Sequence, residues 1–519
     1  MQQKITECLM QEMETTITTP KAGRKEWIGL TVIALPCLLY AMDLTVLNLA
    51  LPRISEDLKP SSSQLLWIVD IYGFMVAGML ITMGTLGDRI GRRKLLLIGA
   101  GAFGLASTLA AFSNTAEILI LNRAILGIAG ATVAPSTLSL IRNMFHDEKQ
   151  RTFAIGIWIT SYSVGGAIGP LVGGLLLQYF WWGSVFLASV PVMVLLLAVG
   201  PKYLPEFRDP NAGRLDLTSA AMSITAVLLV IFGLKKIAED GFAILFAAAI
   251  ASGLVIGWLF IQRQKKLKDP LIDLNLFRDK SPVATLLSMN TLAVFTTFGC
   301  YIFISQYLQL VLGLSPLIAG LWTLPWSVGF IAGSMLTPKV ANHFRKTTIM
   351  AGGLFLAGGG FIILATAGSS GLFAIVASSI LFSVGLAPLF TLITDMILGS
   401  VPPERAGSAG ALSETSSEFG GALGIAVLGS IGTAVYGYLI NDSIPREISA
   451  ADAEAVRGTL GGALAVAEKL PATAQTALVD ISRGAFTQSL VVMAVICAVL
   501  SFALAYLVIL KFRNQQTSA

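Results

Sequence analysis

Two charged side chains lie inside segments that are otherwise almost wholly apolar. Asp43 falls in the apolar stretch 27–51, and Arg123 falls in a second one at 117–141. A charged residue at the centre of a bilayer costs about 2.5–3.5 kcal/mol on insertion scales, so it is expected to face protein, a cavity or a cation. At 1.5 Å per residue, they lie about 12 Å and about 9 Å from the outer ends of their segments, so they can meet. We predict a proton- or cation-handling site there; a static buried ion pair is the alternative.

Further carboxylates lie in other apolar segments. Glu414 and Glu418 are four residues apart in the segment 407–435, which places them on one face of a helix. Two neighbouring carboxylates tend to share a proton, which suits proton coupling or the capture of a dication. The alternative is that one of them only supports packing against nearby Ser and Thr residues. We predict that Asp395 is an entrance or interface carboxylate, and that Asp70 is structural or lines a vestibule.

A short charged loop follows the second apolar segment. It reads Gly84-Thr-Leu-Gly-Asp88-Arg89-Ile-Gly91-Arg92-Arg93-Lys94. Glycines allow a tight turn between two helices, and the aspartate and arginines can pair across neighbouring helix ends. We predict that Asp88 with Arg89, Arg92 and Arg93 holds the inner side of the molecule closed.

The composition requires a membrane. Of the 519 residues, 55% are hydrophobic and 13% are charged, whereas soluble domains have about 25% charged residues. Apolar windows of about 20 residues, the length that crosses a bilayer, recur along the whole chain. We predict an all-α protein with fourteen spans, at 27–51, 65–86, 95–113, 117–141, 153–178, 184–204, 215–234, 242–262, 283–307, 316–338, 348–367, 372–399, 407–435 and 486–510.

The distribution of basic residues orients these spans. With the amino terminus inside, the inner loops and tails, together with Lys202 at the inner end of the sixth span, hold 26 of the 35 Lys and Arg residues, outer segments hold 8, and Arg123 alone lies deep within a span. This bias predicts that both termini are cytoplasmic. The net charge of +5 therefore reflects topology and not nucleic-acid binding. Because His146 and His343 both fall in inner loops, any proton coupling in mid-membrane must use carboxylates.

Several functions are excluded by what the sequence lacks. There is no GxxxxGK[ST] loop to hold ATP, no metal-ligand spacing, and no arrangement of nucleophile and base. The four cysteines are scattered and predict neither a disulfide framework nor a metal cluster. We therefore expect neither an enzyme nor a bound cofactor.

These motifs together resemble the major facilitator superfamily, and specifically its fourteen-span drug:proton antiporters, which include exporters of quaternary ammonium compounds. The resemblance covers roughly residues 27–511. Its signatures are the Asp43 segment, the loop 84–94, the Arg123 segment and the glycine-rich segment around Gly169-Pro170. LLWIVDIYG at 65–73 and the segment 404–427 are also similar to that family.

The resemblance implies a particular organisation. It implies a six-helix bundle at 27–204, an inserted helix pair at 205–270 (spans 7 and 8), and a second bundle at 271–511 with an outer loop at 441–485. Cytoplasmic tails would be 1–26 and 512–519. The loop 341–346, the counterpart of 84–94, lacks the glycine–aspartate pattern, so inner closure is expected to be stronger in the first half.

The same resemblance implies site residues and a function. The antiporter motif would be Gly165, Gly169, Pro170, Gly173 and Gly174. Aromatic faces attract quaternary ammonium ions and Met repacks easily. Candidates to line the cavity are Met42, Trp158, Tyr162, Phe295, Phe298, Tyr301, Trp322 and Trp326.

We therefore expect a proton-driven exporter of lipophilic organic cations, including antiseptics and dyes, in a bacterial plasma membrane. Its partners would be these cations, protons and membrane lipids, and it would act as a monomer. A narrow exporter of one antibiotic or metabolite is the first alternative, and a non-transporting membrane sensor is the second.

Overall fold

The chain is helical throughout the part that the structure describes. The computed structural model describes residues 21–60, 62–208, 216–267, 270–272, 274–277, 282–441, 444 and 449–513, and no strand occurs in these ranges. Most of the two predicted tails, residues 1–20 and 514–519, lies outside the described residues.

The described residues of the first part of the chain form ten helices. They are α2 Arg24–Leu58, α3 Ser62–Ile90, α4 Arg92–Ala111, α5 Ala116–Gly130, α6 Val133–Met144, α7 Glu148–Tyr179, α8 Ser184–Leu187, α9 Val190–Tyr203, α10 Leu217–Asp240 and α11 Ile244–Gln264. The second part comprises α12 Val283–Gln306, a π-helical turn Tyr307–Val311, α13 Pro316–Ala341, α14 Lys346–Leu364, α15 Ala367–Gly399, α16 Ala406–Ile440, α17 Ala450–Gly458, α18 Leu460–Ala467 and α19 Ala472–Arg513. Short 3₁₀ turns cover Leu274–Phe277 and Pro403–Arg405.

Fourteen stretches of the described residues are long and apolar enough to cross a membrane, which confirms the predicted number of spans. A helix satisfies its own backbone N–H and C=O groups, as the bilayer interior requires. The fourth span combines α5 with α6 and the sixth combines α8 with α9, whereas α10 and α11 are the seventh and eighth.

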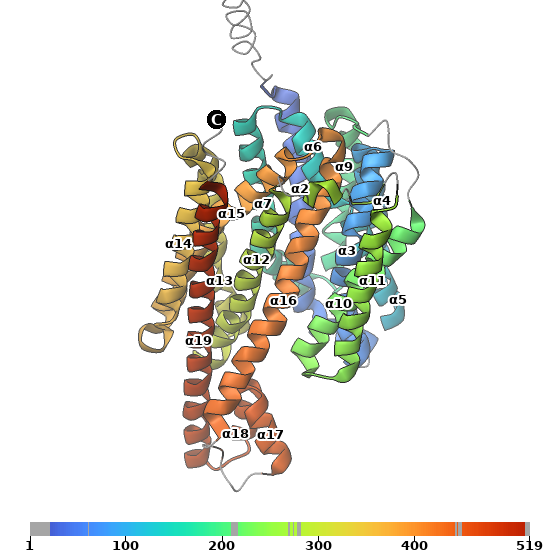
Figure 1. Cartoon of the computed structure of the whole chain (residues 1–519). Helices are drawn as coiled ribbons and strands as arrows, with labels where there is room; N and C mark the ends of the chain where they lie inside the picture. The colour runs from blue at the N-terminus through green and yellow to red at the C-terminus, as the bar shows by residue number, and fades with distance from the viewer. Residues whose placement is uncertain are drawn as a thin grey trace, which may run out of the picture.

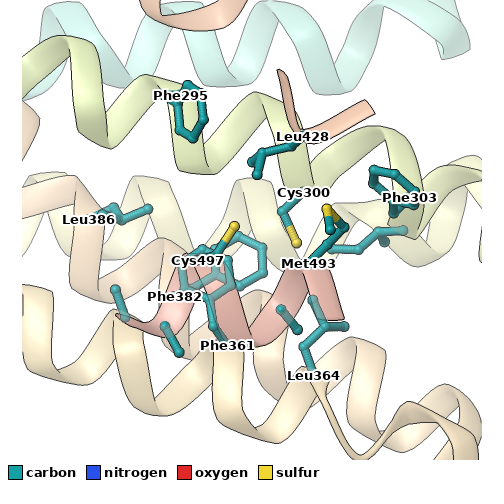
Figure 2. Close-up of a cluster of buried hydrophobic side chains, with 14 of the residues drawn as sticks. Phe295, Cys300, Phe303, Phe361, Leu364, Phe382, Leu386, Leu428, Met493 and Cys497 are labelled. Atoms are coloured by element: carbon teal, nitrogen blue, oxygen red, sulfur yellow. The ribbon is translucent and has the colours of Figure 1, made fainter. Parts of the chain in front are cut away.

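Two large apolar cores form on either side of the inserted pair. The first is built mainly by α2 to α9, with Leu398 of α15 and Ala406 of α16, and the second by α12 to α19. We call α2 to α9 the first bundle and α12 to α19 the second bundle. Figure 2 shows part of the second core, where Phe361 and Phe382 stack with ring centres 5.0 Å apart and Cys300 faces Cys497. The described cysteines are free. Phe295, predicted to line a cavity, belongs to this core and is 9% exposed.

A smaller apolar cluster joins these two parts. It contains Phe74 and Ala77 of α3, Val227 and Ile231 of α10, and Ala422 of α16. We call this three-helix contact the seam. It places the first helix of the inserted pair against both bundles.

The two ends of the molecule differ. Figure 1 shows that both ends of the described chain lie at one end of the bundle, which we call the termini side, whereas α17 and α18 lie at the opposite end, the hairpin side. Both ends lie on the same side because the number of spans is even.

Several predicted boundaries and one predicted count are wrong. The last span was expected to start at 486, but α19 starts at Ala472, because 472–485 contains mostly helix-forming residues and no proline after Pro471. The twelfth was expected at 372, but α15 begins at Ala367 and bends at Gly371, where φ is +52°. Arg123 is not the only basic residue within a span, since Lys235 lies inside the seventh, Leu217–Ile237.

Candidate functional site

Asp43 and Arg123 meet, and the arginine is completely enclosed. Arg123 Nη1 donates a hydrogen bond of 2.6 Å to Asp43 Oδ2, and Arg123 Nε donates one of 3.2 Å to the Ile68 carbonyl oxygen. The guanidinium carbon lies 4.6 Å from the centre of the Tyr72 ring. The Arg123 side chain is 1% exposed and that of Asp43 is 15% exposed. Only the carboxylate of this pair is therefore accessible to a ligand.

Three glycines of α7 fix the helix that contains Asp43. A side chain at Gly165 would strike the backbone of Leu38, and one at Gly169 would strike the Thr45 hydroxyl. Gly173 faces α2 in the same way. Because these glycines are four residues apart, they form a stripe on which α2 packs closely.

The other predicted members of this motif do not take part in the stripe. A Cβ at Gly174 would meet nothing within 4 Å. Pro170 removes one backbone donor from the interior of α7, yet the helix continues from Glu148 to Tyr179. Gly165, Gly169 and Gly173 are therefore the members of the motif that allow α7 to pack closely against α2.

An aromatic cluster adjoins the ion pair. The Tyr40 ring centre lies 6.0 Å from that of Tyr72 and 5.6 Å from that of Tyr162, and Trp158 lies 4.7 Å from Tyr162. Trp158 Nε1 donates a hydrogen bond to Thr137. The hydroxyls of Tyr72 and Tyr162 are buried and have no hydrogen-bond partner in the described part of the chain. Aromatic faces with unpaired hydroxyls suit a bound cation or water.

Glu414 and Glu418 lie on the face of α16 that is turned toward the first bundle. Ala411 and Gly407, on the same face one and two turns earlier, contact α3, and Ala422, one turn later, belongs to the seam. Both carboxylates are partly exposed. The helical repeat therefore directs them into the interface between the two bundles.

The two glutamates share an electrostatic environment with the first bundle. Glu414 and Glu418 lie within range of an electrostatic interaction with Tyr40, as does Asp43, and Glu414 lies within such range of Tyr162 as well. Neither glutamate has a hydrogen-bond or ion-pair partner among the described residues. Carboxylates from opposite bundles thus converge on one aromatic cluster.

The face of α16 opposite the two glutamates packs against α12. Asn290 Nδ2 donates hydrogen bonds to the hydroxyls of Ser416 at 2.7 Å and Ser417 at 2.8 Å. A side chain at Gly420 would strike the Thr291 carbonyl oxygen. These contacts fix the rotation of α16, and hence the direction of both glutamates.

Asp70 has a partner from the inserted pair. Lys235 Nζ of α10 donates a hydrogen bond of 2.9 Å to Asp70 Oδ1 of α3. The same ammonium lies 4.9 Å from the centre of the Phe74 ring. Asp70 is therefore neutralised within the protein, unlike Glu414 and Glu418.

On the termini side, the predicted charged loop binds across the two bundles. Asp88 pairs with Arg92 and accepts hydrogen bonds from the backbone N–H, at 3.1 Å, and the hydroxyl of Ser408. Arg92 donates to the carbonyl oxygens of Gly84 and Glu404. Since Ser408 lies in the first turn of α16, the carboxylate also satisfies a free N–H at a helix amino terminus.

The remaining arginines of the loop, Arg89 and Arg93, lie at other positions. Arg93 lies 3.5 Å from Glu206, within the first bundle, and Arg89 is half-buried at the end of α3. Gly91 has φ of +110°, and a side chain there would strike the Glu206 carboxylate. Arg92, with Asp88, therefore makes the contact between bundles, and Arg93 does not.

A second contact between the bundles surrounds Asp395. This carboxylate is 0% exposed, and it accepts hydrogen bonds from Arg151 Nε and Lys346 Nζ, both at 2.7 Å. Thr152 donates to it at 3.0 Å, and Lys346 also pairs with Glu148. Lys346, at the end of the loop 341–346, thus pairs with a carboxylate on α15. That closure is stronger in the first half stays a prediction.

The other predicted cavity residues do not gather at the site. Phe298, Tyr301 and Trp322 are 49%, 40% and 37% exposed. Trp326 contacts Tyr301, with ring centres 5.0 Å apart. Met42 is buried beside Asp43 on α2 and is 5% exposed.

Two hollows in the described structure lie away from the carboxylates. One, of about 460 Å³, is lined by Thr366 and Gln488 at the junction of α15 and α19. The other, of about 320 Å³, is apolar and lies between α13, α14 and α15 near Phe344. We identify the candidate site by its converging charges and rings and not by these hollows.

Sequence reasoning missed Tyr40, Tyr72, Arg151 and Lys235. The two tyrosines are among many aromatic residues in the spans, and only contacts distinguish them. Lys235 falls in a predicted loop, because the predicted seventh span ends at 234 whereas the observed one ends at Ile237. The available signal was the position of Lys235 directly after the predicted end of an apolar span, where a basic side chain can reach into the membrane.

Fourteen membrane spans among the described residues, in two helical parts that meet along charged and glycine-rich contacts, define a multi-pass membrane protein. Residues 33–425 match the family described as Major Facilitator Superfamily. The chain belongs to the major facilitator superfamily, and it is a transporter and not an enzyme.

Individual relatives agree. The chain is 44% identical over 503 residues to the multidrug efflux pump LfrA of Mycolicibacterium smegmatis, covering 97% of this chain and 99% of that protein. It is 35% identical to the methyl viologen resistance protein SmvA of Salmonella typhimurium, covering 90% and 94%. The human organic anion transporter MFSD10 has the same fold, with a TM-score of 0.59, 15% identity, and coverage of 90% and 99%.

Proposed function

We propose that the protein is a proton-coupled exporter of lipophilic organic cations in a bacterial plasma membrane, with both termini cytoplasmic. The observation that most supports this is the pair Glu414 and Glu418. They lack ion-pair partners among the described residues and face the aromatic cluster of the first bundle. A carboxylate in such a place requires a proton or a cation.

In this mechanism the two bundles open one shared site to each side of the membrane in turn. The ion pairs and hydrogen bonds around Asp88 and Asp395 join the bundles on the termini side, so the site would face the hairpin side in this state. A cation entering from the cytoplasm would bind at Asp43, Glu414 or Glu418, and protons from outside would release it. The two bundles, proposed as 27–204 and 271–511, would rock around this site.

The proton gradient supplies enough free energy. Exchange of one proton for one monovalent cation is electroneutral and draws about 1.36 kcal/mol per pH unit. A second proton would add the membrane potential, about 2.3 kcal/mol per 100 mV.

The names of the relatives support the substrate class. LfrA is a multidrug efflux pump, and SmvA confers resistance to methyl viologen, which is an organic dication. Flat cations of this type fit carboxylates beside aromatic rings.

The test is uptake of ethidium and benzalkonium into inside-out vesicles under an imposed proton gradient. We expect gradient-dependent uptake by the wild type, reduced in Glu414→Gln and Glu418→Gln. Glu56→Gln, an exposed residue at the end of α2, is the matched control and should behave as wild type. Absence of uptake by the wild type would contradict the proposal, and resistance to a single antibiotic class would favour a narrow-substrate exporter.

A further inference from the structure

The inserted pair places a lysine where the proposed site would hold a cation. Lys235 Nζ lies 2.9 Å from Asp70 Oδ1 and 4.9 Å from the Phe74 ring centre. Phe74 in turn lies 6.1 Å from Trp67. A cation between a carboxylate and aromatic faces is also the arrangement that binds quaternary ammonium ions.

The helix that carries Lys235 contacts both bundles. The hydrogen bond of Lys235 goes to α3 of the first bundle, and α10 packs at the seam against Ala422 on α16 of the second. The seam fixes α10 in this position, because Phe232 packs on Phe74 and a Cβ at Gly78 would lie 3.1 Å from Leu228.

The position is also reachable. The Lys235 side chain is 33% exposed and that of Asp70 is 14% exposed. Asp70 lies eight residues from the hairpin-side end of α3, or about 12 Å, a depth similar to that of Arg123 on α5. An ammonium on a flexible four-carbon stem can move aside without a change in the backbone.

We infer that Lys235 is a resident cation that occupies a second anionic subsite, formed by Asp70, Phe74 and Trp67, and that a dicationic substrate must displace it. A monocation is held by the unpaired glutamates alone. A dication spans the glutamates and Asp70, so it competes with Lys235. The charge of Lys235 thereby sets the preference between monocations and dications; this rests on the proposed function.

The experiment measures binding in the purified full-length protein. Ethidium fluorescence reports occupancy, and methyl viologen (a dication) or tetraphenylphosphonium (a monocation) displaces it. In Lys235→Met we expect methyl viologen to displace ethidium at roughly five-fold lower concentration, since a partly exposed ion pair contributes up to about a factor of five. The tetraphenylphosphonium value should remain as in the wild type.

Three further variants complete the test. Lys235→Arg should keep the wild-type ratio, and Lys236→Met, which removes the adjacent charge, should do the same. Asp70→Asn combined with Lys235→Met should abolish the gain. Equal gains for both displacing ligands, a similar gain in Lys236→Met, or a gain that survives Asp70→Asn would overturn the inference. Lys235→Gln replaces Lys235→Met should the latter not yield a monodisperse protein.

Vesicle uptake separates this inference from the proposed function. A wild type that shows no gradient-driven uptake, with the displacement ratio still shifted in Lys235→Met, would contradict the exporter proposal and support the subsite. Normal uptake with an unchanged ratio would do the reverse.

Discussion

At the candidate site, the two bundles treat their carboxylates in opposite ways. In the first bundle, Asp43 receives a hydrogen bond from a fully enclosed arginine, and Asp70 receives one from Lys235. In the second, Glu414 and Glu418 have no ion-pair partner among the described residues. Asp43 and Asp70 therefore have a positive charge within the protein beside them. Glu414 and Glu418 depend on a proton or a ligand to neutralise theirs.

This difference separates stability from ligand binding. Removing one partner of a buried ion pair leaves an uncompensated charge and destabilises a protein by about 3–5 kcal/mol. Replacing an unpaired carboxylate by a neutral amide leaves no such charge behind. The same type of substitution should therefore affect folding in one bundle and only transport in the other.

The largest effect is expected for Asp43→Asn. This change leaves the Arg123 guanidinium buried without its carboxylate, so both stability and transport should fall. We expect uptake to drop at least about ten-fold and the free energy of unfolding to fall by roughly 3 kcal/mol. Uptake into inside-out vesicles and the thermal midpoint in detergent measure these two quantities; an unchanged midpoint would contradict the comparison.

The second largest effect is expected for Glu414→Gln with Glu418→Gln. Transport should fall about ten-fold, because a bound cation loses charged partners that each contribute on the order of 1 kcal/mol. The thermal midpoint should not fall, in contrast to Asp43→Asn. Robust uptake by the double variant would assign coupling to Asp43 alone.

A smaller effect is expected for Asp88→Asn. Its carboxylate is paired like Asp43 but across the bundles, so its loss should favour opening on the termini side. We expect transport to slow a few-fold, because the charge-assisted hydrogen bond to the α16 amino terminus is weakened by about 1 kcal/mol. Binding of ethidium should be retained; lost binding with normal turnover would contradict the assignment.

The smallest effect is expected for Arg123→Lys. The charge beside Asp43 is kept, but the second hydrogen bond, to the Ile68 carbonyl oxygen, and the stacking on Tyr72 are lost. Transport should fall about two- to three-fold, in keeping with the loss of one hydrogen bond. A loss as large as that of Asp43→Asn would show that geometry and not charge decides this pair.

Much of the fold followed from the sequence, because apolar length and the positions of Lys and Arg report directly on membrane crossing. The approach of Asp43 to Arg123 followed from depth along helices, and the shared face of Glu414 and Glu418 from their spacing. Asp395 could be placed at an interface, but its partners Arg151 and Lys346 come from distant helices. Nor could the sequence distinguish Tyr40 from other tyrosines, because selection among aromatic residues depends on tertiary contacts.

The glycine stripe of α7 has a further consequence for motion. Since Gly165 brings the backbone of α7 against that of α2, Asp43 cannot shift without α7, just as Asn290 ties the glutamates of α16 to α12. Asp43 therefore moves together with the helix pair α2 and α7, and the two glutamates move together with the helix pair α16 and α12. The separation between α2 and α16 then serves as a reaction coordinate for the transport cycle, one that a pair of spin labels on these two helices would read directly.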